Sequence, residues 1–218
     1  MRRPLLATLF LMIAAPAAAI EEPTYTVVAT ADDYEVRRYD SYIVAEIDVD
    51  GSMSQTGGTA FRALAGYIFG KNTSSEKMNM TAPVETQQVA EGERMQMTAP
   101  VESRQAADAP ERQTYAFVME RKYTMDTLPR PVDPRIRLVT RPERTMAVRK
   151  YTGGWSESRY AKERAALMTA LDATGIATIG EPILARYDGP MTPWFIRRNE
   201  IMVELPDGPA EELMSAVP

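Results

Sequence analysis

The sequence predicts an α+β fold built from two similar halves, with one main helix in each half. Short runs in which apolar and polar residues alternate indicate strands, and only two segments repeat apolar residues at helical spacing. These segments follow one another as strands, helix and strands, and the same order then occurs again. Because a short helix can bury its apolar side only against a sheet, we expect a ligand groove between helices and sheet or where the halves meet.

Residues 1–19 have the layout of a secretory signal peptide. Two arginines precede an uncharged apolar run over residues 5–15, and small residues precede the acidic Glu21. The run is shorter than a membrane-spanning helix requires. We therefore expect cleavage after Ala19, an exported periplasmic protein and no stable membrane insertion. An uncleaved N-terminal anchor is the alternative.

The first half of the mature chain contains three predicted strands, a helix and a hairpin. Residues 22–50 hold three runs of strand-forming residues, and the last of them alternates apolar and mostly polar residues over 43–49. Apolar residues at helical spacing within 57–70 predict a short amphipathic helix that ends at a glycine. Residues 71–112 are polar and contain the segment MTAPVE twice, and we interpret them as a hairpin with a long tip.

The second half repeats the pattern of the first. A strand at 114–119 closes the first half, and a proline-rich loop at 123–134 joins the two halves near residues 129–134. The second half contains strands at 135–140 and 145–151, a helix at 156–174 that ends at Gly175, and strands at 182–187 and 200–205. The strings VRRY at 36–39 and VRKY at 148–151 are alike, which suggests a duplication and a pseudo-twofold axis. We expect one domain over residues 20–206 and a flexible tail over 207–218.

The composition excludes several classes of site. The chain of 218 residues has no cysteine and no histidine, which rules out disulfides, thiolate metal sites, cysteine catalysis and histidine acid–base chemistry. A net charge of −5 argues against a nucleic-acid-binding surface. The common motifs of nucleophilic, phosphate and dinucleotide sites are also missing, so we expect a monomeric binding protein and not an enzyme.

Four of the fourteen methionines occur in a near-duplicate, KMNMTAPVE at 77–85 and RMQMTAPVE at 94–102. Three interpretations of Met78, Met80, Met95 and Met97 are open. They fill the core as adaptable apolar side chains on one face of a strand, contact haem iron through a thioether, or surround a Cu(I) ion. The last interpretation would make the chain a periplasmic copper-binding protein.

Five segments resemble the SOUL haem-binding family, and they occur in the family's order along nearly the whole mature chain. They are YEVRRY at 34–39, AFRALAGYIFG at 60–70, MTAPV at 80–84, TLPRP at 127–131 and TPWFIRRNE at 192–200. The resemblance implies a distorted β-barrel or sheet of two pseudo-symmetric βαββ-like halves, similar to the gyrase-inhibitory-protein-like effector-binding fold. It also implies reversible binding of haem or a related tetrapyrrole in a shallow hydrophobic cleft, without catalysis.

The resemblance places this cleft beside the first helix and the loop between the last strands. Carried over by position, the candidate ligand-binding residues are Phe61, Arg62, Ala65, Tyr67, Phe69, Met191, Pro193, Trp194, Phe195, Arg197 and Glu200. Some family members are thought to hold the iron with a histidine, and a chain without histidine cannot do so. Tyr67 is then either an oxygen ligand to ferric haem or a surface tyrosine.

Other candidates also have two interpretations. Trp194 and Phe195 either present aromatic faces to a flat ligand or cap the core. Arg197 and Arg198 either pair with porphyrin propionates or form a solvated surface pair. Glu200 lies either near the centre of the fold, where a glutamate of the related effector-binding fold meets cationic ligands, or at an exposed edge. Binding of amphipathic or cationic small molecules is therefore a further alternative function.

Overall fold

The protein is built around one antiparallel sheet of nine strands, seen in a computed structural model that describes residues 20–73, 92–106 and 109–206. The order of the strands across the sheet is β1-β2-β9-β11-β10-β5-β6-β3-β8. The strands are β1 (Tyr25–Thr30), β2 (Glu35–Tyr39), β3 (Tyr42–Asp50), β5 (Val101–Ala106), β6 (Ala109–Val118), β8 (Arg137–Arg141), β9 (Arg144–Thr152), β10 (Ile179–Arg186) and β11 (Arg198–Glu204).

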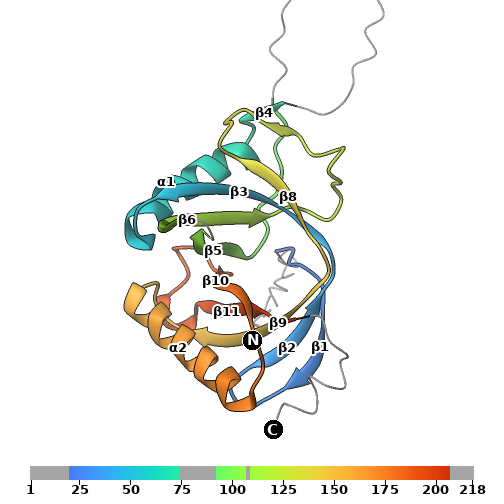
Figure 1. The fold of residues 1–218 in the computed structure, drawn as a ribbon. Helices are drawn as coiled ribbons and strands as arrows, with labels where there is room; N and C mark the ends of the chain where they lie inside the picture. Colours follow the sequence, from blue (N-terminus) through green and yellow to red (C-terminus); the bar gives the residue numbers. More distant parts are fainter. Residues whose placement is uncertain (1–19, 74–91, 107–108, 207–218) are drawn as a thin grey trace, which may run out of the picture.

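Two helices cover one face of this sheet. Helix α1 (Met53–Ile68) packs on β3 and β6, and helix α2 (Glu157–Thr174) packs on β9 and β11, so that β5 and β10 lie between them (Figure 1). Strands β4 (Asn72–Thr73) and β7 (Arg130–Pro131) form a separate small ladder, and a 3₁₀ turn, η1 (Trp194–Ile196), precedes β11. Among the described residues, no helix has the length and apolar character needed to cross a membrane.

The strand order confirms two pseudo-symmetric halves. One half is β3-α1-β5-β6 and the other is β9-α2-β10-β11, and their strands occur in mirrored order on either side of the β5–β10 pair. A pseudo-twofold axis therefore passes between β5 and β10. The predicted α+β fold with two βαββ halves and two main helices is confirmed.

The sequence likeness that suggested a duplication does not coincide with this symmetry. VRRY at 36–39 lies on β2 and VRKY at 148–151 lies on β9, and these two strands pair directly with each other, with Val36 opposite Ala147. The symmetry partner of β9 is β3, and that of β2 is β8. Val36 also packs on the helix-bearing face whereas Val148 packs on the inner face, so the likeness does not mark the symmetry of the halves.

The first helix is longer than predicted. It begins at Met53, before Gly57 and Gly58, and these glycines lie within its first turns. The Ser52 backbone N–H donates to Gln55 Oε1 at 3.3 Å, which satisfies a donor ahead of the first turn. Glycine lowers helix propensity, so the sequence pattern placed the start too late. The second helix agrees with prediction, since Ser156 caps it and Gly175, at φ +72°, ends it.

The predicted long-tipped hairpin is shorter than expected. Strands β5 and β6 form it, and the ladder closes with Ala106 opposite Ala109. The second MTAPVE segment reaches β5 only at Val101, and residues 92–100 run alongside the sheet without strand pairing. Residues 74–91, which contain the first segment, lie outside the described part of the chain, as do the predicted signal peptide and tail.

The helix-bearing face of the sheet holds two apolar clusters, one under each helix. Leu64 and Phe117 belong to the cluster under α1, and Leu167 and Ile201 belong to the cluster under α2. Burial of such side chains supplies most of the driving force that holds each helix on the sheet. The two clusters are separate, and the space between them lies over β5 and β10.

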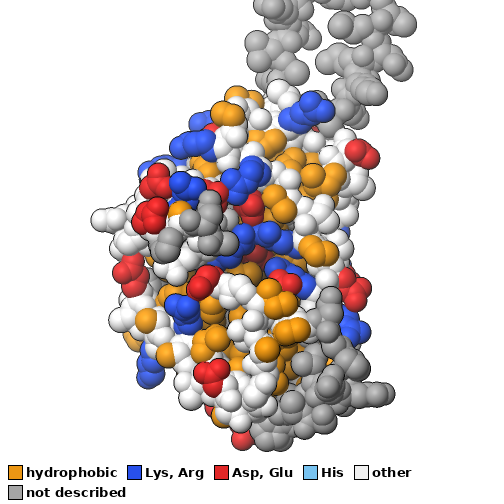
Figure 2. All heavy atoms as spheres, in the orientation of Figure 1, with side chains coloured by type: hydrophobic (Ala, Val, Ile, Leu, Met, Phe, Trp, Pro, Cys, Tyr) orange, Lys and Arg blue, Asp and Glu red, His pale blue; other side chains and the backbone are white. Residues whose placement is uncertain are grey.

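The opposite face lies inside the curl of the sheet. Tyr42 of β3 hydrogen-bonds both Arg144 of β9 and Glu102 of β5, although four strands separate β3 from β9 in the sheet order. Only a curled sheet brings these side chains together. Figure 2 shows charged side chains of both signs gathered at the middle of this view, surrounded by apolar ones.

Candidate ligand-binding cleft

A cleft of about 740 Å³ lies on the helix-bearing face, where the two halves meet. Its floor comes from β5, β6 and β10, and its walls come from the first turns of α1 and α2 and from the loop after β10. Small-molecule sites enclose roughly 300–1,000 Å³. The expectation of a groove at the junction of the halves is therefore confirmed.

Apolar side chains form most of the cleft. Phe61 of α1 contacts Phe117 of β6 edge to face, with 5.4 Å between the ring centroids. Val101 and Leu184 extend the apolar floor across β5 and β10. Gly57 exposes the helix backbone to the cleft, since a Cβ there would meet only Tyr115, with the hydroxyl oxygen at 3.7 Å and the nearest ring carbon at 4.0 Å. The glycines that shifted the predicted start of α1 therefore widen the site.

Trp155 forms the wall opposite Phe61, from the turn that leads into α2. Its indole N–H donates to Asn199 Oδ1 at 3.0 Å, and the fully buried Asn199 in turn donates to the Gly153 carbonyl at 3.1 Å. The Arg197 guanidinium lies 4.2 Å from the indole centroid. These contacts fix the ring before any ligand arrives. The sequence interpretation treated the Gly153–Gly154 segment only as an entry to the helix and missed this tryptophan.

Arg186, the last residue of β10, brings a positive charge to the cleft. Its Nε is buried and has no hydrogen-bond partner among the described residues, and none of the ion pairs found there includes it. Burial lowers the pKa of Arg186, and the hydroxyls of Tyr115 and Tyr151 raise it only in part. The guanidinium lies 5.5 Å from the Trp155 ring centroid. The sequence interpretation did not identify this residue, because nothing local distinguishes it from other strand arginines.

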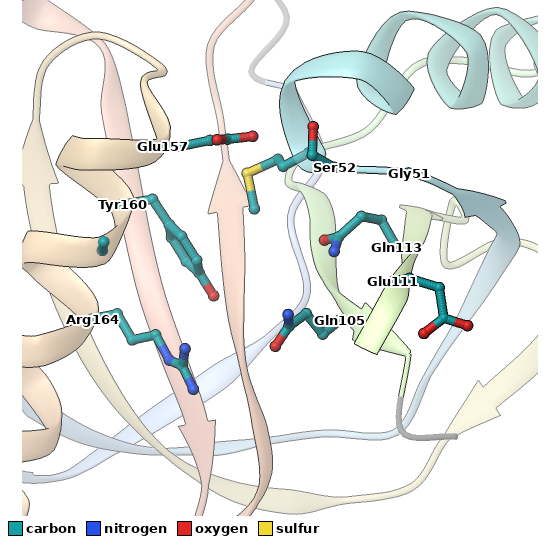
Figure 3. A pocket seen from close by; sticks show the side chains of 10 residues that line it. Gly51, Ser52, Gln105, Glu111, Gln113, Glu157, Tyr160 and Arg164 are labelled. Carbon is teal, nitrogen blue, oxygen red and sulfur yellow. The ribbon is translucent and has the colours of Figure 1, made fainter. Parts of the chain in front are cut away.

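A second, polar pocket of about 450 Å³ continues the cleft along the groove between the helices. The two cavities share Met53 and Glu157. Figure 3 shows Tyr160 and Arg164 of α2 on one side, with Gln113 and the exposed Gln105 on the other. The buried Oε1 of Gln113 has no hydrogen-bond partner among the described residues. The groove is therefore apolar at one end and polar at the other.

Comparison with known proteins identifies the family. The family model for the SOUL heme-binding protein matches residues 20–204. The chain belongs to the SOUL haem-binding family. This confirms the resemblance carried by the five sequence segments, and the family membership suggests haem binding. No curated protein sequence matches the chain.

Solved structures share the fold of this SOUL protein at low sequence identity. The C-terminal domain of EcmrR is 12% identical with a TM-score of 0.54, and the match covers 84% of this chain and 99% of that domain. An uncharacterized conserved protein from Listeria innocua is 11% identical, with a TM-score of 0.54 and coverage of 80% and 93%. A hydrolase from Listeria innocua is 14% identical, with a TM-score of 0.51 and coverage of 82% and 94%. These similarities confirm the predicted fold class and carry no statement about activity.

Of the helix residues predicted for the SOUL cleft, Phe61 alone lines it. Arg62 and Phe69 are exposed outside the cleft, and Ala65 is buried under α1. Tyr67 is 1% exposed, and its hydroxyl donates to the Pro129 carbonyl at 2.8 Å. Burial raises the pKa of Tyr67, so the phenol stays protonated. The expected surface position of Tyr67 is wrong, and the residue has no access to a ligand.

The predicted aromatic loop lies just beyond the cleft. Gly189 and Pro190 line the cleft, but Met191, Pro193, Trp194 and Phe195 are exposed further along the loop. The Arg197 guanidinium donates to the carbonyls of Thr192 and Pro190, each at 2.7 Å. Arg197 therefore holds the loop in shape and is engaged by protein groups. Trp194 and Phe195 therefore neither cap the core nor line the cleft.

Glu200 lies on the inner face of the sheet, is fully buried and does not line the cleft. Its carboxylate accepts from Arg37 Nη1 at 3.1 Å, from Tyr187 Oη at 2.6 Å and from Arg198 Nη2 at 3.1 Å. Burial lowers the pKa of Arg37, but Glu200 and hydrogen bonds to Tyr39 and Glu35 more than offset it, and the pKa is raised. The interpretation of Glu200 as an exposed edge residue is wrong. Its interior position is confirmed, with its charge matched by protein cations.

The methionine repeat has different roles at its two described positions. Met95 is 5% exposed and packs in the core under α1, which agrees with the core-filling interpretation. Met97 is partly buried against the same core and lines the cleft. Met78 and Met80 lie outside the described residues. A four-methionine copper site would require Met95 to leave the core.

Proposed function

We propose that this SOUL protein binds haem or a related tetrapyrrole reversibly in the cleft between its halves, as an exported carrier or buffer without catalytic activity. The observation that carries the proposal is the cleft itself, about 740 Å³ in volume and faced by Phe61, Phe117 and Trp155. Aromatic walls of this kind suit a flat, largely apolar macrocycle. Membership of the SOUL family supports the same ligand class.

The side chains of the cleft favour weak or thioether contact with haem iron. Tyr151 and Tyr115 line the cleft, but burial raises the pKa of Tyr151 to about 12 and also raises that of Tyr115, so both stay protonated near neutral pH. Met53 and Met97 also line the cleft. A thioether can ligate haem iron, and these two methionines would be the residues to do so.

Export with cleavage after Ala19 is part of the proposal, and residues 20–22 would then form the N-terminus of the mature domain. Ile20 lines the cleft, and the Glu21 carbonyl accepts from the Ala99 backbone N–H at 2.9 Å. Glu22 pairs with Arg198 at 3.0 Å. The segment directly after the expected cleavage point is therefore bound to the domain, and removal of residues 1–19 would leave these contacts in place.

A cleft-filling substitution tests the proposal. In Gly57→Leu, the new side chain would occupy the cleft, and replacement of a helical glycine would stabilise α1 by up to about 1 kcal/mol. We expect the purified wild-type protein to give a saturable one-to-one Soret shift with ferric haem and Gly57→Leu to lose it while remaining folded. Thr59→Leu, at an exposed position on the same helix, is the matched control and should bind normally.

Two outcomes would reject the proposal. Non-saturating, aggregate-like spectra with the wild-type protein would remove haem as the ligand. Normal binding by Gly57→Leu would place the haem elsewhere on the molecule. Measurement of the unfolding midpoint of each variant shows whether a loss of binding comes from the cleft or from the fold.

A further inference from the structure

Arg186 is the only basic residue among the described residues that line the cleft. It extends from β10 on the helix-bearing face, where its neighbours across the strands are Val101 and Asn199. The Arg186 side chain is partly buried and its Nε is fully buried, and protein interiors compensate such a loss of hydration with carboxylates or hydrogen-bond acceptors. At Arg186 the described residues supply neither an ion pair nor an acceptor for Nε. Among the described residues, the Arg186 guanidinium therefore has no directly bound counter-charge.

We propose that Arg186 is the anion-recognition residue of the cleft, and that the ligand is a flat amphipathic molecule bound with a carboxylate directed inward onto this guanidinium. A carboxylate can accept two parallel N–H bonds from arginine, which would satisfy the buried donors. The inference rests on the proposed function for the identity of the site. It adds the charge of the ligand, its orientation and the residue that selects it.

The two acidic side chains of the cleft, Glu157 and Asp188, keep their negative charge but are not ion-pair partners of Arg186. Glu157 accepts from the Ser54 backbone N–H at 2.8 Å, at the adjoining ends of α1 and α2. Asp188 accepts from the Arg198 backbone N–H at 2.6 Å. Both carboxylates are engaged by backbone donors, and neither forms an ion pair with Arg186. At the Arg186 end of the cleft an organic cation would meet a like charge, whereas a carboxylate would meet its counter-charge.

The position of Trp155 supports inward binding of the carboxylate. The ring lies 5.5 Å from Arg186 and is anchored by Asn199, so one rigid aromatic wall stands beside the charge. A ligand whose ring packs between Trp155 and Phe61 can place an acidic side chain on the strand beneath. The carboxylates of a tetrapyrrole would then be buried and its apolar edge would face the cleft mouth, near the exposed Trp194 loop.

Metal-free porphyrins test the inference without any contribution from iron. We would titrate the purified protein with protoporphyrin IX and with its dimethyl ester, and follow porphyrin fluorescence. A hydrogen-bonded charge pair corresponds to roughly a ten- to hundredfold change in affinity. We expect the wild-type protein to prefer the diacid by about that factor, and Arg186→Met to lose the preference while binding the ester within about twofold of wild type.

Arg62→Met is the matched control, because Arg62 is exposed on α1 outside the cleft. This variant should keep the preference for the diacid. Equal affinity of the wild-type protein for diacid and ester, or an unchanged preference in Arg186→Met, would overturn the inference. Either result would leave the proposed cleft intact as long as Gly57→Leu still removed binding.

A second probe pair does not depend on tetrapyrroles. The wild-type protein should bind 1-pyrenebutyrate at least tenfold more tightly than the 1-pyrenebutylammonium cation, and Arg186→Met should remove that difference. If porphyrins do not bind but this preference holds, the tetrapyrrole assignment fails and the role of Arg186 stands. Tighter binding of the ammonium compound by the wild-type protein would overturn the anion-recognition role directly.

Discussion

Replacement of Glu200 by glutamine should separate stability from ligand binding. The carboxylate is fully buried and accepts from Arg37, Tyr187 and Arg198, so the substitution leaves two buried or partly buried cations without their shared counter-charge. Removal of one partner from a buried ion pair costs about 3–5 kcal/mol. Arg37 also pairs with Glu35 at 2.7 Å, and Arg198 also pairs with Glu22 at 3.0 Å. These second partners favour the lower end, about 3 kcal/mol.

The assay is chemical and thermal unfolding, combined with haem titration below the unfolding transition. For a domain of this size, about 3 kcal/mol corresponds to a decrease in Tm of roughly 6–12 °C. Glu181→Gln is the matched control, since Glu181 pairs with Arg164 at 2.9 Å with both side chains at least 40% exposed. An exposed pair is worth less than about 1 kcal/mol, so this control should unfold near the wild type.

The haem affinity of Glu200→Gln is the second quantity to be measured. Glu200 faces the inside of the curl and does not line the cleft, so folded Glu200→Gln should bind haem within about twofold of wild type. A loss of affinity with unchanged stability would refute this reasoning and would restore Glu200 as a ligand-binding residue. A stability loss below about 1 kcal/mol would show that the buried charges are hydrated or rearranged.

Three further predictions concern the cleft, the core and the titration behaviour. Trp155→Ala should weaken haem binding by about tenfold, whereas Trp194→Ala should change it by less than about twofold, as measured by Soret titration. Met95→Ala should destabilise the fold by about 2–5 kcal/mol and Met95→Leu by less than about 1.5 kcal/mol in urea unfolding, whereas retention of full stability in Met95→Ala would contradict its place in the core. Stability measured against pH should be flat between about pH 5 and 9, because the chain has no histidine. Below this range Asp48 titrates. Burial raises its pKa, but hydrogen bonds from Arg137 and Thr114 lower the pKa by more, so the pKa in the folded protein lies below 3.8. The stability that Asp48 contributes is therefore lost as pH falls from 3.8 through the pKa of the folded state. Above this range, burial raises the pKa of Tyr151 from 10.0 to about 12, so the stability that Tyr151 contributes is lost as pH rises between these two values. An unfolding midpoint that changed near pH 6.5 would contradict the predicted pH dependence.

The elements of the fold could be predicted because their signals are local. Alternation of burial along β3 and the caps at Ser156 and Gly175 depend on a few neighbouring residues. The start of α1 could not be predicted from the same signals, because Gly57 and Gly58 disfavour helix and their role is to leave space in a cleft formed by distant strands. The similar strings of β2 and β9 misled because a local likeness does not show which strands are related by the symmetry, and Val36 and Val148 face opposite sides of the sheet.

The candidate site was less predictable than the fold because it is assembled from both halves. Phe61 was found because its helix carries the family pattern, but Trp155 and Arg186 come from the other half and acquire a role only where β10 meets β5. The family pattern instead led to Trp194 and Phe195, which precede β11 in an exposed loop. Tyr67 was placed on the wrong surface because helical spacing alone does not show the β4–β7 ladder and the adjoining loop that cover it.

A comparison of the buried and partly buried arginines of the sheet supports the proposed role of Arg186. On the inner face, Arg37 and Arg198 share Glu200, Arg141 pairs with Glu46 at 2.6 Å, and Arg144 pairs with Glu204 at 3.5 Å. The sequence therefore matches positive charge with negative charge wherever the sheet closes on itself, as a stable interior requires. Arg186 extends from the same sheet toward the other face and has no such match among the described residues. A fold that pairs the other arginines of this sheet gains nothing in stability from leaving Arg186 unpaired, and this contrast supports the proposal that Arg186 binds a carboxylate of the ligand.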